Sequence, residues 1–494
     1  MALQLIEHKT SSDLDLRRHP ARFESDDRRV ITLPFTPGGE PRLRKVVRRV
    51  CRMGEPEVER MLEHVYTQFR DRHADIDAVL MANYKTAMEV IGEPRFVSRK
   101  RKLLIGAYFT MEYSLESAAL FNPSIVPHFD QTGVPRGALR FIVSLRAVGE
   151  GHVSSIVFRT GMIHADGEVS IDPPKPFISR ASLAMDKAYL KKLFWSKLND
   201  LNVSHDVVAK VMELLGDSFT FAELEHAIDA AHRQNGHLPQ SHETYEAMRW
   251  LARSNYAVKV PPDVDISNIA IFPQSEQESR GIEDLRLVRF ADDDGAACYL
   301  GTYTAYNGYS YLPQLLETSD WRRLSMHTLN GKCVQNKGMA IFPRRIDGHY
   351  VMSSRLDGEN LFIMYSDMLH FWESAELMVK PKFAWEFMHI GNCGSPIETD
   401  AGWLLLTHGV GPMREYAIGA MLLDLDDPRK VLGHLSEPLL TPTGEERDGY
   451  VPNVVYSCGY LAHGGRLYIP YAMSDLASSF ASVDLDALLE RLTP

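Results

Sequence analysis

The second half of this 494-residue chain repeats one plan several times. An apolar strand runs into a short polar tip, a second apolar strand returns, and a turn rich in Ser, Thr and Asp closes the unit. The copies span 297–320, 348–367, 403–424 and 467–484. Repeated β units of this kind are typical of propellers, in which the polar tips meet around a central axis. We therefore look for chemistry at the tips.

A further β unit lies in the first half, at 138–146 and 153–159, so that about five units fit the chain. This predicts a mainly β fold, a five-bladed β-propeller. Two stretches depart from it. Residues 41–91 and 181–257 carry apolar side chains at helical spacing. We expect an N-terminal extension and helical region over 1–100, and a catalytic propeller over 101–494. A helical insertion over about 180–258 would lie between the first two blades.

Two shorter segments complete this interpretation. Residues 1–35 are polar and charged, and residues 34–41, rich in Pro and Gly, predict an extended linker. The apolar run 103–110 predicts the first strand of the β region.

Composition limits the classes of function. A net charge of -11 argues against a general nucleic-acid binder, because phosphate backbones attract basic surfaces. The N-terminus lacks the apolar core of a signal peptide, and no apolar stretch is long enough to span a bilayer. Five scattered cysteines without CxxC spacing predict reduced thiols, each in a buried structural position, a cytoplasmic location and no zinc or other metal site.

The clearest acid candidate lies in the segment Gly281 to Arg286, just before an alternating strand. Glu283 and Asp284 stand there beside Arg286, and a carboxyl held by charge and hydrogen bonds can act as a general acid. A solvated turn is the alternative. Two further polar residues at turns could bind sugar hydroxyls or simply cap those turns, namely Asn122 before the first β unit and Asp475 after the last inner strand.

Basic residues gather around the third β unit. Lys337, Arg344 and Arg355 flank its strands, and such cations would bind phosphate in a pocket that excludes water. A surface position is the alternative for each. Glu398 and His408 lie among glycines at the next strand ends, where backbone can approach a ligand closely. His408 could donate to an anion or shuttle a proton, or be a buried histidine satisfied by a carbonyl.

Several of these segments, taken in order, resemble family 130 of the glycoside hydrolases, which contains β-mannoside phosphorylases and some β-mannosidases on a five-bladed propeller. The matching segments are 281–286, 342–343, 394–399, 407–410, 423–428 and 451–459. The resemblance covers roughly residues 100–165 and 265–494, so the chain looks like a longer branch with extra helices. Leu285 stands where the family motif usually has Pro.

The resemblance implies roles for the candidates. Asp284 matches the general acid, which in the phosphorylases works through a mannose hydroxyl that relays the proton. Asn122 and Asp475 match residues that contact the sugar in the −1 position, and we count Glu283, Arg286 and Glu398 as further substrate-binding candidates. The segments that carry phosphate-binding groups in the phosphorylases hold Arg146, Lys337, Arg344, Arg355 and His408 here.

Three functions follow as hypotheses. The first is inverting phosphorolysis of β-mannosides, with inorganic phosphate as co-substrate, no cofactor and mannose 1-phosphate as product. The second is an inverting β-mannosidase. It needs a second carboxylate about 6.5–9.5 Å from the acid to activate water, and Glu150, Glu359 and Glu398 are possible bases. The third is a non-catalytic carbohydrate-binding propeller. The expected partners are an oligosaccharide or disaccharide, phosphate and a second copy of the chain. The linkage between the sugars is not predicted.

Overall fold

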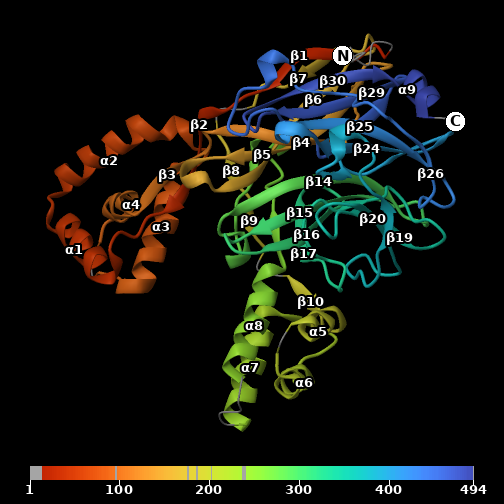
Figure 1. The fold of residues 1–494 in the computed structure, drawn as a ribbon. Helices are drawn as coiled ribbons and strands as arrows, with labels where there is room; N and C mark the ends of the chain where they lie inside the picture. Colours follow the sequence, from red (N-terminus) through yellow and green to blue (C-terminus); the bar gives the residue numbers. More distant parts are fainter. Residues whose placement is uncertain are drawn as a thin grey trace, which may run out of the picture.

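The computed structural model describes residues 14–94, 97–174, 177–184, 187–201, 203–235 and 241–492. The fold is mainly β, and two groups of helices project from the sheets on different sides (Figure 1). Within the described ranges, no helix is long and apolar enough to cross a membrane.

Five successive stretches of the described chain form antiparallel meanders, and they include every repeat identified in the sequence. The first two meanders belong to one twelve-stranded sheet, and the other three form separate sheets. The first meander contains β4 (Ala119–Pro127), β5 (Leu139–Val148), β6 (Ser154–Ile163) and β7 (Val169–Ile171), and the second contains β14 (Gly281–Ala291), β15 (Ala297–Tyr306), β16 (Tyr311–Thr318) and β17 (Arg323–Thr328). The third contains β18 (Ala340–Ile341), β19 (Tyr350–Ser354), β20 (Leu361–Ser366) and β21 (Glu376–Val379), and the fourth contains β22 (His389–Asn392), β23 (Ile397–Thr399), β24 (Gly402–Val410), β25 (Tyr416–Leu423) and β26 (Val431–His434). The fifth contains β27 (Val455–Tyr456), β28 (Leu461–His463), β29 (Arg466–Met473) and β30 (Ala477–Asp484).

The register of each meander decides which loops can meet. In the second meander, Glu283 at the start of β14 lies opposite Thr304 near the end of β15. The β15–β16 turn therefore lies at the same end of the sheet as the start of β14. The other meanders share this plan, so the start of each first strand and the turn between its second and third strands define one end of the sheet. We call this end of the meanders the tip end.

The N-terminal segment differs from the prediction of a polar extension. β1 (Arg17–Phe23) pairs with β30 and becomes part of the last sheet. Phe23 is buried, and its ring lies 5.7 Å from that of Phe480. The segment escaped prediction because only two of its side chains, His19 and Phe23, are buried beside charged neighbours. β2 (Asp26–Pro34) then pairs with β3 (Thr110–Glu116), and the chain passes from β2 to the first helix at Gly39.

Helical periodicity over 41–91 predicted helices where the structure has them. They are α1 (Gly39–Arg52), α2 (Glu55–Phe69) and α3 (Ile76–Ile91). The strand predicted over 103–110 is wrong for most of its length, because Arg99–Tyr108 form α4. The Ser98 hydroxyl accepts a hydrogen bond from the Arg101 amide and caps this helix. Five residues of α4 in a row are buried or nearly so, which removes the periodicity that separates a helix from a strand in a short apolar run.

The second helical group matches the predicted insertion and forms the long projection below the sheets in Figure 1. Its helices are α5 (Lys191–Asp200), α6 (His205–Glu213), α7 (Phe221–Asn235) and α8 (Ser241–Ser254). Short strands tie it to the sheets: β12 (Tyr256–Lys259) pairs with β17 and with β9 (Ser182–Leu183). The remaining strands and α-helix of the described chain are β8 (Ser179–Arg180), β10 (Ala188–Leu190), β11 (Ser218–Thr220), β13 (Ile269–Ile271) and the C-terminal helix α9 (Leu485–Leu492).

The five thiols are unpaired, in agreement with the prediction of reduced cysteines. The prediction that all are buried is wrong for Cys51, which is exposed, and Cys298 is half-buried.

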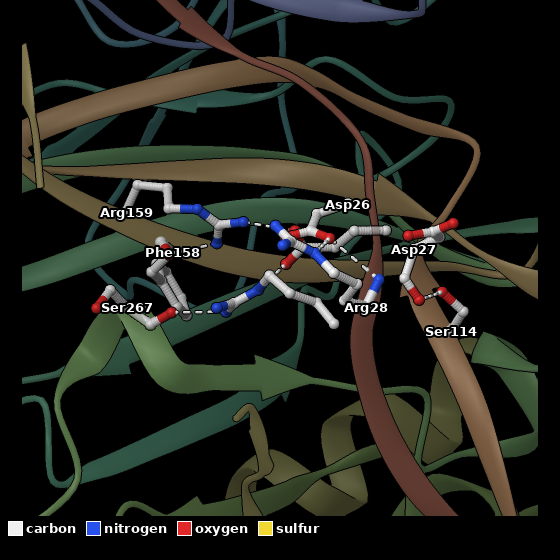
Figure 2. A network of polar contacts seen from close by, with 9 residues as sticks. Asp26, Asp27, Arg28, Ser114, Phe158, Arg159 and Ser267 are labelled. Carbon is white, nitrogen blue, oxygen red and sulfur yellow. Dashed lines mark hydrogen bonds and ion pairs between the residues drawn. The ribbon is translucent and has the colours of Figure 1, made fainter. Parts of the chain in front are cut away.

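A buried ion network joins β2 and β3 to the first meander. Glu116 accepts hydrogen bonds from Arg29 (3.0 Å) and from Arg159, and the three side chains are at most 5% exposed. Arg29 also donates to the Ser267 carbonyl at 2.9 Å, and Arg159 to the Phe158 carbonyl at 2.9 Å. Figure 2 shows Arg159 and Ser267 on two sides of this network. Two arginines share the Glu116 carboxylate, Asp26 also attracts Arg29, and main-chain carbonyls help to solvate the buried charges.

Candidate active site

The structure holds Asp284 in a strained, buried position at the tip end of β14. Its backbone is left-handed, with φ of 56°, and the β14–β15 register shifts between Glu283 and Arg286. Such bulges redirect side chains and are frequent beside active sites. Asn122 has φ of 51° at a matching register shift in β4, and its Nδ2 donates to Asp284 Oδ1 at 2.6 Å. Two irregular strand ends thus bring together residues 162 positions apart.

Cations surround the neighbouring carboxylates of Glu283 and Asp284. Arg146 donates to Glu283 at 2.7 Å, and its other terminal nitrogen lies 3.6 Å from Asp284 Oδ1. Lys337 Nζ is 3.7 Å from Glu283. Burial alone would raise the pKa of Asp284, but Arg146, Lys337, Arg286 and the Asn122 hydrogen bond favour the anion, and the pKa lies below its ordinary value. Asp284 is therefore ionised in the free protein near neutral pH.

Arg286 is a scaffold for the site. Its guanidinium donates to the Asp284 carbonyl at 3.0 Å, to the Tyr456 hydroxyl at 2.6 Å and to Asn392 Oδ1 at 3.2 Å. Asn392 in turn donates to the Gly338 carbonyl at 2.6 Å. These bonds connect the second, fourth and fifth meanders and consume most of the donors of Arg286. Arg286 thus orients the neighbouring groups more than it offers itself to a ligand.

Asp475 has the opposite electrostatic balance to Asp284. It lies in the β29–β30 turn with φ of 53°. Burial raises its pKa to about 6, since the attraction of Arg146 does not outweigh burial and the repulsion from Asp284. The two acids are electrostatic neighbours with pKa values moved apart, as expected where carboxyl groups have different roles in one reaction.

His408, near the end of β24, is buried and neutral. Burial first, and then Arg355, His389 and Arg286, hold its pKa well below the ordinary value. Its Nδ1 lies 3.0 Å from the Asn392 carbonyl, which can only accept, so Nδ1 carries the proton. Nε2 is then a bare acceptor. The expectation that His408 donates to an anion needs correction, because the free nitrogen can only receive a hydrogen bond.

Arg355 is brought to the same tip end, in the β19–β20 turn. Burial, and then Arg355, Arg414 and Lys337, lower the pKa of His389 to about 4, so these cations surround one imidazole. Within the described ranges, neither Arg355 nor Arg414 has a carboxylate within 4.0 Å. Around Arg146, Arg286, Lys337, Arg355 and Arg414, the described part of the chain places the three carboxylates Glu283, Asp284 and Asp475. The excess positive charge suits a bound anion.

Sequence reasoning missed several members of this group. Arg414 lies in the β24–β25 turn, His389 begins β22, and the rings of Tyr416 and Tyr456 lie 6.2 and 4.9 Å from that of His408. Each stands at the tip end of a meander. A search of every tip, and not only of the basic and glycine-rich ones, would have found Arg414 and His389.

Arg344 and Glu398 do not join the site, although both were predicted to. They bond to each other in a bidentate pair at 2.8 and 2.7 Å, and the Arg344 guanidinium stacks on Trp403 at 4.9 Å. Glu398 lies opposite Trp403 at the start of β24, whereas His408 is near its end. At about 3.3 Å per residue, the two positions are roughly 17 Å apart. The register of β24 therefore places this ion pair at the end of the sheet remote from the tips.

Two further acids considered as possible bases, Glu150 and Glu359, are exposed. A cavity of about 850 Å³ lies elsewhere, beside α8, with a lining that is mainly apolar. We place the candidate site at the tip end because a buried acid and a buried amide meet there with cations around them.

Residues 264–493 match the family described as beta-1,4-mannooligosaccharide phosphorylase (Glyco_hydro_130). A 1,2-beta-oligomannan phosphorylase of Thermoanaerobacter sp. (strain X514) is 36% identical over 223 residues, 43% of this chain and 71% of that protein. A beta-1,2-mannobiose phosphorylase of Listeria innocua serovar 6a is 28% identical over 229 residues, 45% of this chain and 63% of that protein. A solved Listeria innocua beta-1,2-mannobiose phosphorylase overlays with a TM-score of 0.43 at 20% identity, covering 77% of this chain and 93% of that one.

Proposed function

Because this chain belongs to glycoside hydrolase family 130, we propose that it is an inverting phosphorylase of β-mannosides. Inorganic phosphate is the co-substrate, mannose 1-phosphate is the product, and no cofactor takes part. The observation that supports this most is the group Lys337, Arg355 and Arg414 beside the buried pair Asn122–Asp284. Among the described residues, Arg355 and Arg414 have no carboxylate within 4.0 Å, and with Lys337, which lies 3.7 Å from Glu283, they form a site for an anionic nucleophile next to an acid.

Phosphate attacks the anomeric carbon from the face opposite the leaving oxygen, while Asp284 supplies the proton through a sugar hydroxyl. The free protein holds Asp284 ionised, because Arg146, Lys337 and Arg286 lower its pKa. A bound phosphate dianion offsets these charges and thereby raises the proton affinity of Asp284, which takes up one proton from solvent before the glycosidic bond breaks. Binding of the nucleophile thus prepares the acid. Asp475, with its pKa of about 6, contacts the sugar in the −1 position alongside Asn122.

His408 recognises the proton of hydrogen phosphate in this scheme. Its Nε2 is an acceptor, whereas Lys337, Arg355 and Arg414 supply donors and charge. A site with donors and one acceptor matches an anion that still carries a hydroxyl.

Hydrolysis has less support from the geometry. Of the acids considered as bases for water, Glu398 is bound to Arg344 at the remote end of the sheet, and Glu150 and Glu359 are exposed. The curated relatives named above are phosphorylases, two of them for β-1,2-linked mannosides. We therefore propose β-1,2-mannobiose as the first substrate to test, followed by β-1,4-linked mannosides.

The proposal also includes the overall architecture, the cellular location and the assembly of the chain. We expect the five meanders to close as a five-bladed propeller with the tip ends at its axis. Support comes from contacts between the first and last meanders: Cys458 N donates to the Pro123 carbonyl at 2.8 Å, and Leu120 N to the Leu476 carbonyl at 3.1 Å. Reduced thiols suit a cytoplasmic enzyme. Assembly into a homo-oligomer stays a prediction.

Turnover of β-1,2-mannobiose with and without phosphate tests this function, using Asp284→Asn as the probe variant. Asn keeps the shape and tolerates the left-handed backbone, but it cannot carry the proton. We expect phosphate-dependent turnover that falls by about 10²–10⁴-fold in Asp284→Asn. The exposed Asp448→Asn serves as a matched control that keeps full activity. Activity near that of the unaltered protein in Asp284→Asn would show that the acid is assigned wrongly.

A further inference from the structure

Three side chains of metal-ligand type meet away from the Asp284 site. Glu317 lies in β16, His327 in β17, and His370 in the loop between β20 and β21. One ligand atom from each lies within 4.8 Å of the others, and the described residues hold no second group of this kind. Glu317 Oε1 is 3.7 Å from His327 Nε2 and accepts a hydrogen bond from His370 Nε2.

The fold brings these groups together from two sheets. His327 lies opposite Leu315 and Ser325 lies opposite Glu317, so Glu317 and His327 are diagonal neighbours on one face of the β16–β17 pair. Asn330 fixes the main chain of His370, because its N and Nδ2 both donate to the His370 carbonyl at 2.9 Å. Trp372 N returns a bond to the Asn330 carbonyl at 2.8 Å. The ligand atoms are therefore held by rigid backbone.

We propose that Glu317, His327 and His370 bind a divalent transition-metal ion, with Zn²⁺ as the best match. Two imidazoles and one carboxylate form a common three-ligand zinc set, with bonds of about 2.0–2.2 Å. Tetrahedral ligands at that distance are about 3.3–3.5 Å apart. The 3.7 Å separation of Glu317 and His327 needs a shift of only a few tenths of an ångström. The ion would take the place of the hydrogen bond between Glu317 and His370.

A fourth position is open to water. A small cavity of about 100 Å³ is lined by His327 and His370, and a larger cavity is lined by Glu317 and His370. The nearby cation, Lys187, is directed to the backbone: its Nζ donates to the carbonyls of Tyr256 at 3.1 Å and Met326 at 2.9 Å. A metal ion with three protein ligands and one water therefore fits the space.

The position suggests a structural role for the ion. It would connect the second meander to the third at the base of the helical insertion, where Lys197 Nζ of α5 donates to the Leu329 carbonyl at 3.2 Å. Leu190 and Leu193 of the insertion line the same small cavity. The ion would fasten this junction and take no part in phosphorolysis.

Zn²⁺ titration of the tag-free, chelator-treated full chain tests the proposal, by calorimetry and by metal analysis after dialysis. We expect one Zn²⁺ per chain, and an affinity lower by at least about 100-fold in His327→Ala and in His370→Ala. His349→Ala is the matched control, since His349 is a half-exposed histidine 3.2 Å from Asp367. It should bind one Zn²⁺ with unchanged affinity.

Co²⁺ provides a readout that needs no altered protein. The unaltered chain loaded with Co²⁺ should give the intense visible absorption of a four-coordinate site, and Zn²⁺ should abolish it. Circular dichroism establishes that the variants are folded. The absence of stoichiometric Zn²⁺ binding by the unaltered chain, or equal affinity in folded His327→Ala, would overturn the proposal.

Discussion

At the scale of single residues, this site separates two aspartates that a sequence cannot tell apart. Asp284 and Asp475 both have a left-handed backbone at a tip end, and the charge of Arg146 attracts both carboxylates. Three cations and an amide donor keep Asp284 ionised, whereas burial and the charge of Asp284 favour the protonated form of Asp475. Position in the charge pattern, and not residue type, sets the role of each acid.

Asp475→Asn should stabilise the protein at high pH and not at low pH. The folded pKa of about 6 lies above the ordinary value of 3.8, so the folded state loses stability as pH rises through this interval. Asn mimics the protonated acid and tolerates the left-handed backbone. We expect a gain of up to about 3 kcal/mol in the free energy of unfolding at pH 8, together with loss of turnover.

Urea unfolding at pH 8 and pH 4 measures this difference, and Asp448→Asn is the exposed control. An equal effect of Asp475→Asn at the two pH values would mean that Asp475 does not carry a raised pKa.

Gly391→Ala should weaken phosphate binding through His408. A Cβ on Gly391 would lie 2.5 Å from His408 Cε1 and 2.8 Å from Nε2, so the ring must leave its place. Loss of one hydrogen bond to an anion costs about 1.5–3 kcal/mol, which raises KM for phosphate by roughly 10–100-fold. Steady-state kinetics should show little change in KM for the mannoside. Gly444→Ala, with open space around it, is the control, and unchanged KM for phosphate in Gly391→Ala would exclude His408 from the phosphate site.

At the scale of elements, register explains both what the sequence predicted and what it missed. The alternation of apolar residues was enough to find the strands around 297–320, 348–367 and 403–424. It could not show that β24 carries Glu398 and His408 to opposite ends of its sheet, which is why Arg344 and Glu398 were wrongly grouped with the site. Nor could local pattern reveal β1, because its partner β30 lies more than 450 residues away.

The helices show the same limit of prediction from local sequence pattern. The periodic segments of α1–α3 and α5–α8 were predicted from spacing alone, whereas α4 was mistaken for a strand because its central residues are buried all round. Asn122, Asp284 and Asp475 were found as candidates, but the bulges that bring the first two together depend on the pairing of distant strands.

Glu116→Gln should destabilise the junction of β2, β3 and the first meander. It would leave the buried Arg29 and Arg159 without their shared carboxylate, which costs about 3–5 kcal/mol in buried pairs. Thermal or urea unfolding measures the loss. Glu40→Gln removes the carboxylate of the exposed Arg44 pair, 2.7 Å long, and should cost less than about 1 kcal/mol. Equal losses in the two variants would show that the network in Figure 2 does not stabilise the fold.

At the scale of the whole molecule, the chain combines a mainly β body with two helical projections that join it at separate places (Figure 1). The candidate site lies at the tip ends of the meanders, so its residues come from all of them and from segments between Asn122 and Asp475. The group Glu317, His327 and His370 lies instead at the base of the insertion. The candidate site and the junction that attaches the helical insertion thus lie in different parts of the molecule.

The most direct test follows β-1,2-mannobiose, incubated with the full chain and phosphate, by ³¹P and ¹H NMR. We predict that the phosphate signal declines as one mannose 1-phosphate forms, with the α configuration that inversion of a β-mannoside requires. No sugar should be released when phosphate is omitted. Free mannose formed at the same rate with and without phosphate would contradict phosphorolysis and identify the protein as a hydrolase.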